Sequence, residues 1–163
     1  MILRAQSAGL ALTLIPAVLV VMNVFYALAA YPAGVLSDNG NRANVLIIGL
    51  GLLVAGDIVL ATVPGLIGVA IGVSLWGLHM GFSQGLLAAL VADTAPAELR
   101  GTAFGVLNLV TGVALLAASV IAGALWNAFG AQATFLMGAG FAAIALVALA
   151  ASRNWLPLNR PSL

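Results

Sequence analysis

A small set of polar side chains interrupts the otherwise apolar stretches of this sequence. Two of them, His79 and Asp57, can exchange a proton, and the unperturbed pKa of a histidine, near 6.5, lies close to neutral pH. We therefore predict His79 and Asp57 as candidates for proton coupling. The side chains that could line a polar cavity for a solute are Asn23, Tyr26, His79, Ser83, Gln84, Asn108 and Thr111.

Each of these residues also has a purely structural interpretation. Amide and hydroxyl side chains can hydrogen-bond between packed helices inside a membrane. His79 can be a neutral packing residue, and Asp57 can simply reach the membrane surface. Both interpretations stay open, although a charge held within a bilayer is costly and commonly functional.

The composition excludes several other classes of protein. A chain with one histidine and no cysteine cannot form a multi-histidine metal centre, a disulfide or a thiol nucleophile. The sequence shows neither paired carboxylates nor a Ser–His–Asp arrangement that would support an enzyme. We also expect no cofactor. Five arginines against four acids give a net charge of +1, which provides no basic surface for nucleic acid.

Apolar runs fill almost the whole chain. The sequence is 64% hydrophobic and only 6% charged, and its mean hydropathy is +1.22. A hydrocarbon core about 30 Å thick needs about 20 apolar residues per helix, and spans of this length must be helical because lipid cannot satisfy free backbone groups. We predict one all-α integral membrane domain over residues 1–163. Its five spans are expected at about 10–36, 44–62, 66–92, 101–126 and 132–152.

The first run also has features of a cleaved signal peptide, because Arg4 precedes it and Ala27-Leu28-Ala29 resembles a cleavage site. The run is longer than the 7–15 apolar residues of a signal peptide and contains Pro16 and Asn23. These features favour a first membrane span.

The arginines predict the orientation. If all five runs cross the membrane, Arg42, Arg100, Arg153 and Arg160 lie on one side and Arg4 lies on the other. Short cytoplasmic loops carry the excess of basic residues. We therefore expect an external amino terminus and a cytoplasmic carboxyl terminus, in a cell membrane that we predict to be a bacterial inner membrane. An external start with an odd number of spans suggests a piece of a larger protein.

Small residues form stripes on three of the predicted helices. Gly77, Gly81 and Gly85 recur at four-residue steps in 66–92. In 101–126 a stripe contains Gly101, Gly105, Asn108, Gly112, Ser119, Gly123 and Trp126. In 10–36 a similar stripe contains Pro16, Asn23, Ala27, Ala30 and Gly34. Small residues on one face let another helix approach closely, so we expect these stripes to be packing faces.

Two loops carry a family resemblance. The stretch YPAGVLSDNGNR resembles the cytoplasmic loop signature of the major facilitator superfamily, with Gly34, Leu36, Asp38 and Arg42 at matching positions. Asn39 and Asn41 depart from that signature. The stretch LVADTAPAELRGTAFG is similar to the later cytoplasmic loop of the same family and contains Asp93, Glu98 and Arg100.

The resemblance implies spans eight to twelve of a twelve-helix transporter, a partial carboxyl-terminal bundle. Its partners would be the lipid bilayer, a small solute and the missing amino-terminal half. In this family two bundles rock about a central site, so 66–92 would line the cavity, 10–36 and 101–126 would flank it, and the other two spans would face lipid.

The loop charges allow two interpretations. A gating cluster that holds the inward side closed would consist of Gly34, Asp38, Arg42, Asp93, Glu98 and Arg100, with Asp38 near the start of the helix at Gly101. Alternatively, the loops are simply solvated. The expected function is secondary active transport by alternating access. The alternative is a non-transporting module that binds partner helices through its small-residue faces.

Overall fold

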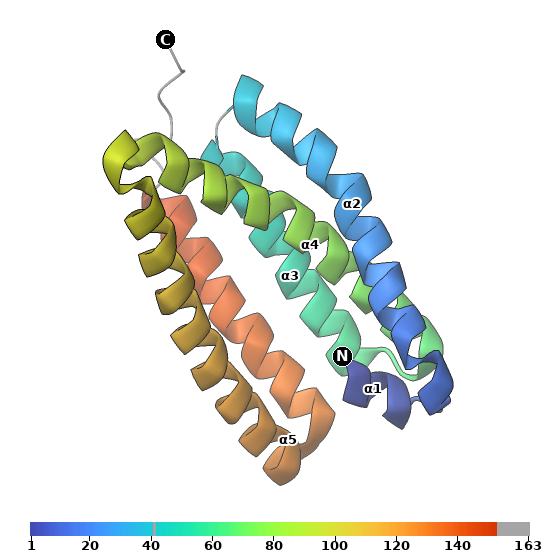
Figure 1. Ribbon diagram of the computed structural model, residues 1–163. Coiled ribbons are helices and arrows are strands. Elements are labelled where there is room, and N and C mark those ends of the chain that lie inside the picture. The colour runs from blue at the N-terminus through green and yellow to red at the C-terminus, as the bar shows by residue number, and fades with distance from the viewer. Residues whose placement is uncertain (41, 153–163) are drawn as a thin grey trace.

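The structure, a computed structural model, describes residues 1–40 and 42–152. All regular elements in these ranges are helices (Figure 1), which confirms the all-α prediction. The long helices are α2 (Ile15–Asn39), α3 (Arg42–Thr62), α4 (Gly65–Thr94) and α5 (Arg100–Ser152). A short helix, α1 (Ile2–Ser7), and two 3-10 turns, Leu12–Leu14 and Ala97–Leu99, were not predicted, because such short segments carry no clear periodic pattern.

Four helices are long and apolar enough to cross a membrane. The last of them, α5, is interrupted at Gly130, whose φ of 80° and ψ of −176° are not helical. The ribbon reverses direction within α5 (Figure 1), so this helix consists of two antiparallel arms, residues 100–129 and 131–152. The predicted runs 101–126 and 132–152 lie on the first and second arm. Arg153 and Arg160, used above for the orientation, lie outside the described residues.

The long helices pack in a row rather than around a common centre. Helix α4 contacts both α2 and α3, and α3 contacts α5, whereas α2 and α5 make no extensive contact within the described residues. Figure 1 shows α3 and α4 between α2 and the two arms of α5. Buried residues of α5 are found on its second arm, at Phe135, Ala139 and Ala142.

Glycines permit the closest of these contacts. A Cβ added to Gly77 would collide with the Met22 carbonyl oxygen, and one added to Gly81 would stand 2.6 Å from the Ala29 Cβ. Gly72 meets Leu60 in the same way across the α3–α4 contact. The stripe predicted on 66–92 is therefore a packing face, except at Gly85, where a Cβ would meet nothing within 4 Å.

Among the described residues the stripe predicted on 101–126 is not a close packing face, apart from Trp126, whose ring meets that of Phe135 on the second arm edge-on. A Cβ added at Gly101, Gly105, Gly112 or Gly123 would meet nothing within 4 Å, and residues 108–121 are all exposed. The physical reason is that the second arm of α5 occupies the contact with α3 and leaves the first arm at the edge of the row. The first arm therefore presents its apolar side chains and its glycines without a covering helix from the described residues.

Candidate functional site

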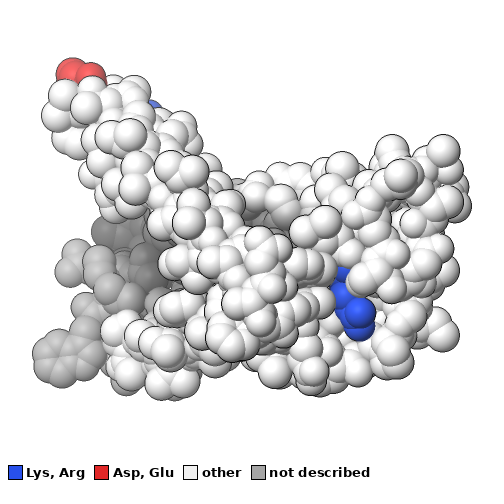
Figure 2. Space-filling view, turned by 90° about the horizontal axis from the view of Figure 1, so that it is seen from below, with Lys and Arg blue, Asp and Glu red and all other residues white. Residues whose placement is uncertain are grey.

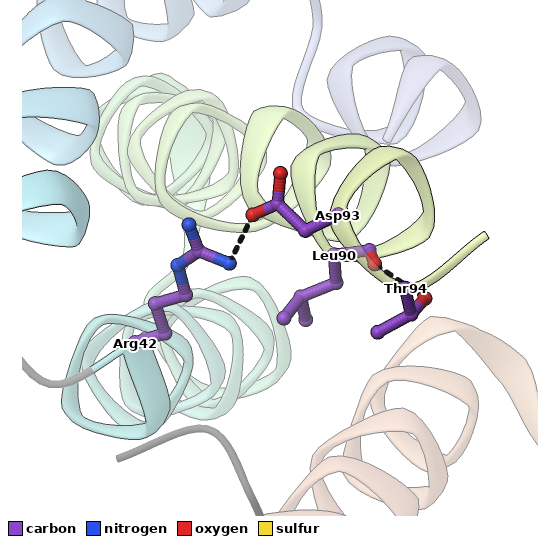
Figure 3. A network of polar contacts seen from close by, with 4 residues as sticks. All are labelled: Arg42, Leu90, Asp93 and Thr94. Atoms are coloured by element: carbon purple, nitrogen blue, oxygen red, sulfur yellow. Dashed lines mark hydrogen bonds and ion pairs between the residues drawn. The ribbon is translucent and has the colours of Figure 1, made fainter. Parts of the chain in front are cut away.

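The two signature loops meet at one end of the molecule, here called the loop end. Arg42 begins α3 and Asp93 lies in the last turn of α4. Their side chains form an ion pair with 2.6 Å between Nη1 and Oδ2 (Figure 3). The side chains are 25% and 54% exposed, respectively. The Thr94 hydroxyl donates to the Leu90 carbonyl oxygen at 2.7 Å and so stays within its own helix.

The other predicted gating residues do not join this pair. Asp38, Glu98 and Arg100 are exposed, and Arg42–Asp93 is the ion pair formed among the described residues. The expected position of Asp38 beside the start of the helix at Gly101 is wrong, because α3 and α4 separate α2 from α5 (Figure 1).

A cavity of about 190 Å³ lies between α2 and α4 on the loop-end side of their close contact. Tyr26, Gly34, Ser37 and Asp38 line it from α2, and Gly85 lines it from α4. Ser37 is buried, and Tyr26 is partly buried. The cavity exists because α2 and α4 touch at Gly81 and diverge by Gly85, where the space around the glycine is open. Tyr26 and Gly34 therefore share a cavity with Asp38.

Four of the predicted cavity residues are exposed and do not converge within the part of the chain that the structure describes. Asn23 donates from Nδ2 to the Leu19 carbonyl oxygen of its own helix at 2.7 Å. Gln84 is exposed on α4, and Asn108 and Thr111 are exposed on the first arm of α5.

His79 faces α3 across the α3–α4 pair, and Ser83 is partly buried on α4. The Nδ1 atom of His79 lies 2.8 Å from the Gly49 carbonyl oxygen of α3, so Nδ1 must carry the proton in this contact. The Ser83 hydroxyl donates to the His79 carbonyl oxygen at 2.8 Å. The His79 ring also meets the Trp76 ring edge-on, with 6.1 Å between centroids. The contacts of His79 correspond to its packing interpretation, whereas the Ser83 hydroxyl bonds within its own helix.

Asp57 is buried, with 4% of its surface exposed. The indole nitrogen of Trp76 donates to Oδ1 at 2.9 Å. Oδ2 lies against Gly138 of the second α5 arm, where an added Cβ would stand 2.7 Å away. The carboxylate therefore points between three helices, and its position relative to the membrane surface stays a prediction.

The sequence interpretation missed Trp76 as the partner of Asp57. A signal was present, because Pro64-Gly65 makes a tight connection between α3 and α4, and a short connection makes the flanking helices antiparallel neighbours. Residues on either side of such a turn can meet across the pair.

Arg4, which the sequence analysis used only to predict the orientation in the membrane, also hydrogen-bonds to the end of α3. Its Nε donates to the Leu60 carbonyl oxygen at 3.0 Å, and its Nη2 donates to that of Val63 at 3.2 Å. The last carbonyl oxygens of a helix lack intrahelical partners and attract cations, so Arg4 caps α3 from α1. Figure 2 views this end of the molecule and shows few charged side chains around a small basic patch.

Comparison with known proteins agrees with this architecture. The family model described as Major Facilitator Superfamily matches residues 1–162. An uncharacterized MFS-type transporter of Methanocaldococcus jannaschii is 34% identical over 152 residues, which cover 88% of this chain and 37% of the relative. The chain thus spans little more than a third of that relative's length. No solved structure matches. A match over nearly every residue, together with the membrane-spanning helices, means that the chain belongs to the major facilitator superfamily.

Proposed function

We propose that this chain is part of a secondary active transporter that moves a small solute by alternating access, driven by an ion gradient. It belongs to a family of membrane transporters that are not enzymes. The observation that carries the proposal is the ion pair between Arg42 and Asp93, which joins the two loops that bear the family signature. The chain would act together with the remainder of a longer transporter.

The Arg42–Asp93 pair has the properties of a reversible gate contact. A solvent-exposed ion pair contributes about 0–1 kcal/mol, and 1 kcal/mol changes the ratio of two states about fivefold. Since both side chains are partly exposed, the pair can bias the inward-closed state and still break in each cycle. Asp38, on the wall of the neighbouring cavity, is proposed to take part when the helices move.

The cavity between α2 and α4 is proposed as one wall of the solute path. Its volume, about 190 Å³, is below the roughly 300–1,000 Å³ of typical small-molecule sites. We therefore propose that the path is completed by the remainder of the transporter. Tyr26 would contact the solute, and Asn23 and Gln84, exposed on the same two helices, are further candidates.

The loop end is proposed to face the cytoplasm. Arg42 and Arg100 lie at this end, whereas Arg4 lies at the opposite end beside Leu60 and Val63, and basic residues concentrate in cytoplasmic loops. Cysteine labelling in intact cells tests this proposal, because the chain has no cysteine of its own. A cysteine at Glu98 should react with an impermeant maleimide only after the membrane is opened.

Reconstitution in liposomes tests transport. The complete transporter that contains this chain is reconstituted, and solutes of several chemical classes are added while a trapped dye reports internal pH. We expect Asp38→Asn to lower the maximal rate of the transported solute several-fold with little change in its half-saturating concentration.

If Asp38→Asn instead raised the half-saturating concentration and left the maximal rate unchanged, the role of Asp38 in the conformational cycle would be refuted. The alternative, a non-transporting assembly module, would be favoured by two results together. The complete protein would move none of the solutes, and this chain alone would bind a partner helix tightly.

A further inference from the structure

The cavity between α2 and α4 contains a buried hydroxyl group that has no partner among the described residues. Ser37 is only 8% exposed and lines this cavity, yet its hydroxyl makes no hydrogen bond to any residue that the structure describes. Ser74 and Ser83 of α4, by contrast, each donate to the carbonyl oxygen four residues earlier. A buried polar group without a partner is costly, so Ser37 indicates a ligand in the cavity.

Asp38 supplies a negative charge beside this hydroxyl group. It follows Ser37 on α2 and lines the same cavity. Within residues 1–40 and 42–152 no basic side chain pairs with it, and Arg42 is held by Asp93 instead (Figure 3). The last turn of α2 carries no basic residue either, and the final carbonyl groups of a helix attract cations. The charges at this end of the cavity therefore favour a cation.

We propose that this cavity binds a monovalent metal cation of the size of sodium, and that this cation is the coupling ion of the transporter. The Asp38 carboxylate and the Ser37 hydroxyl oxygen would be its protein ligands, with water completing its shell. Tyr26 lies about 16 Å further along α2 at 1.5 Å per residue, which leaves the other end of the cavity for the solute. The inference rests on the proposed function, because that function is driven by an ion gradient.

The size and the chemistry of the cavity suit a hydrated ion. Its volume is about 190 Å³, which is the share of about six waters at roughly 30 Å³ each. Carboxylate, hydroxyl and water oxygens are hard ligands for hard cations. A single carboxylate balances one positive charge, and in the described part of the chain no group of three acidic, histidine or cysteine side chains could hold a metal ion. A monovalent cation therefore fits better than a divalent one.

Protection of an introduced cysteine tests the site, because the sequence has no cysteine of its own. Gly85→Cys places a thiol on the α4 wall of the cavity. Gly101→Cys is the matched control, because Gly101 is exposed and outside the lining, and an added Cβ meets nothing within 4 Å at either glycine. The full chain in detergent reacts with a water-soluble methanethiosulfonate in sodium, potassium or magnesium chloride, or in N-methylglucamine chloride of equal ionic strength.

Sodium at twice its dissociation constant should slow the reaction at position 85 about threefold, because about a third of the sites then remain free. The rate at position 101 should not change. Asp38→Asn should abolish the protection, and Ser37→Ala should raise the protecting concentration of sodium about fivefold to tenfold, the effect of losing one bonded oxygen.

A second measurement needs no cysteine. In the unmodified chain sodium should raise the thermal unfolding midpoint above that in N-methylglucamine chloride, because the cation binds the folded state, and Asp38→Asn should remove this response. A chain with neither protection at position 85 nor a sodium-dependent midpoint overturns the inference. Protection by magnesium as strong as that by sodium overturns the assignment to a monovalent ion, and protection that survives Asp38→Asn overturns the assignment to this cavity.

The liposome assay of the complete transporter separates the inference from the proposed function. Solute uptake that requires a sodium gradient, and that loses this requirement in Asp38→Asn, supports the inference. Uptake driven by a pH gradient alone overturns it, while the proposed function survives. Sodium protection in a transporter that moves no solute overturns the proposed function and the coupling role together, and leaves only the cation site.

Discussion

Gly81 on α4 lies so close to Ala29 on α2 that a Cβ added to the glycine would stand 2.6 Å from the alanine Cβ. The Tyr26 carbonyl oxygen would be only 2.9 Å from the same added carbon. Real Cβ atoms do not approach other heavy atoms so closely, so α2 and α4 pack too tightly here for any side chain at position 81. One turn further along α4, at Gly85, the same construction meets nothing.

The contrast between these two glycines gives the first prediction. Gly81→Ala should destabilise the protein by about 1–3 kcal/mol, the usual cost of overpacking a well-filled contact. Gly85→Ala should be neutral or stabilising by about 0.5–1 kcal/mol, because alanine is the better helix former. Titration from mild detergent into dodecyl sulfate, followed by circular dichroism, measures both. Equal effects of the two substitutions would contradict the close α2–α4 contact.

The second prediction concerns Arg42 and Asp93. A double-mutant cycle with Arg42→Gln and Asp93→Asn should give a coupling energy of about 0.2–1 kcal/mol, as for exposed ion pairs. The coupling should shrink when salt is raised from 0.01 to 1 M, since the Debye length falls from about 30 Å to 3 Å. Glu98→Gln, an exposed acid outside the pair, is the control. A coupling that ignores salt would mean that the pair is buried, contrary to the structure.

The third prediction tests the hydrogen bond from Trp76 to the buried carboxylate of Asp57. Trp76→Phe removes the donor to Asp57 and keeps an aromatic ring. It should destabilise the protein by about 0.6 kcal/mol and by no more than about 1.7 kcal/mol, the average and the maximum measured for interhelical hydrogen bonds in a membrane protein. In the Asp57→Asn background the loss should be smaller, because an amide oxygen is a weaker acceptor than a carboxylate. The same dodecyl sulfate titration provides the four values. Strictly additive effects would contradict a stronger hydrogen bond to the carboxylate, and no loss in the Trp76→Phe single variant would show that the 2.9 Å contact contributes nothing.

The fourth prediction tests the cap on α3. Arg4→Met keeps an unbranched side chain but removes the hydrogen bonds to the Leu60 and Val63 carbonyl oxygens. A cation at a helix carboxyl terminus contributes about 0.3–1 kcal/mol when exposed and up to about 2 kcal/mol when partly buried, so we expect a loss of about 1 kcal/mol. Gln6→Met, exposed on the same short helix, should change the unfolding midpoint little. Equal unfolding midpoints for the two variants would show that Arg4 does not stabilise α3 as a cap.

Hydropathy was sufficient to predict an all-helical membrane protein. Inside a bilayer a long apolar segment must satisfy its own backbone hydrogen bonds, which a helix does. Loop motifs likewise identified the family, and two charges of the expected loop cluster, Arg42 and Asp93, form an ion pair. Both successes depend on properties that are local in sequence.

Which side of a helix meets which neighbour was less predictable. The stripes of small residues on 66–92 and 101–126 look alike in sequence, yet Gly77 and Gly81 are in tight contact and Gly105 and Gly112 are open. The difference arises from the order of helices in space, which no single helix encodes. For the same reason the sequence did not predict that Trp76 bonds to Asp57 or that His79 points toward Gly49, because both contacts depend on how α3 and α4 pack.

Gly130 has a consequence for how the membrane itself shapes this chain. Without the reversal, the 53 residues of α5 would form one rod of about 80 Å at 1.5 Å per residue, more than twice the roughly 30 Å depth of the hydrocarbon. No charged residue lies between Arg100 and Arg153 to anchor a bend at either surface. A bilayer of this thickness cannot hold the helix as one straight rod, and the positive φ of Gly130 allows the backbone to reverse there. The antiparallel direction of the last 22 residues therefore follows from the bilayer thickness as much as from their own side chains.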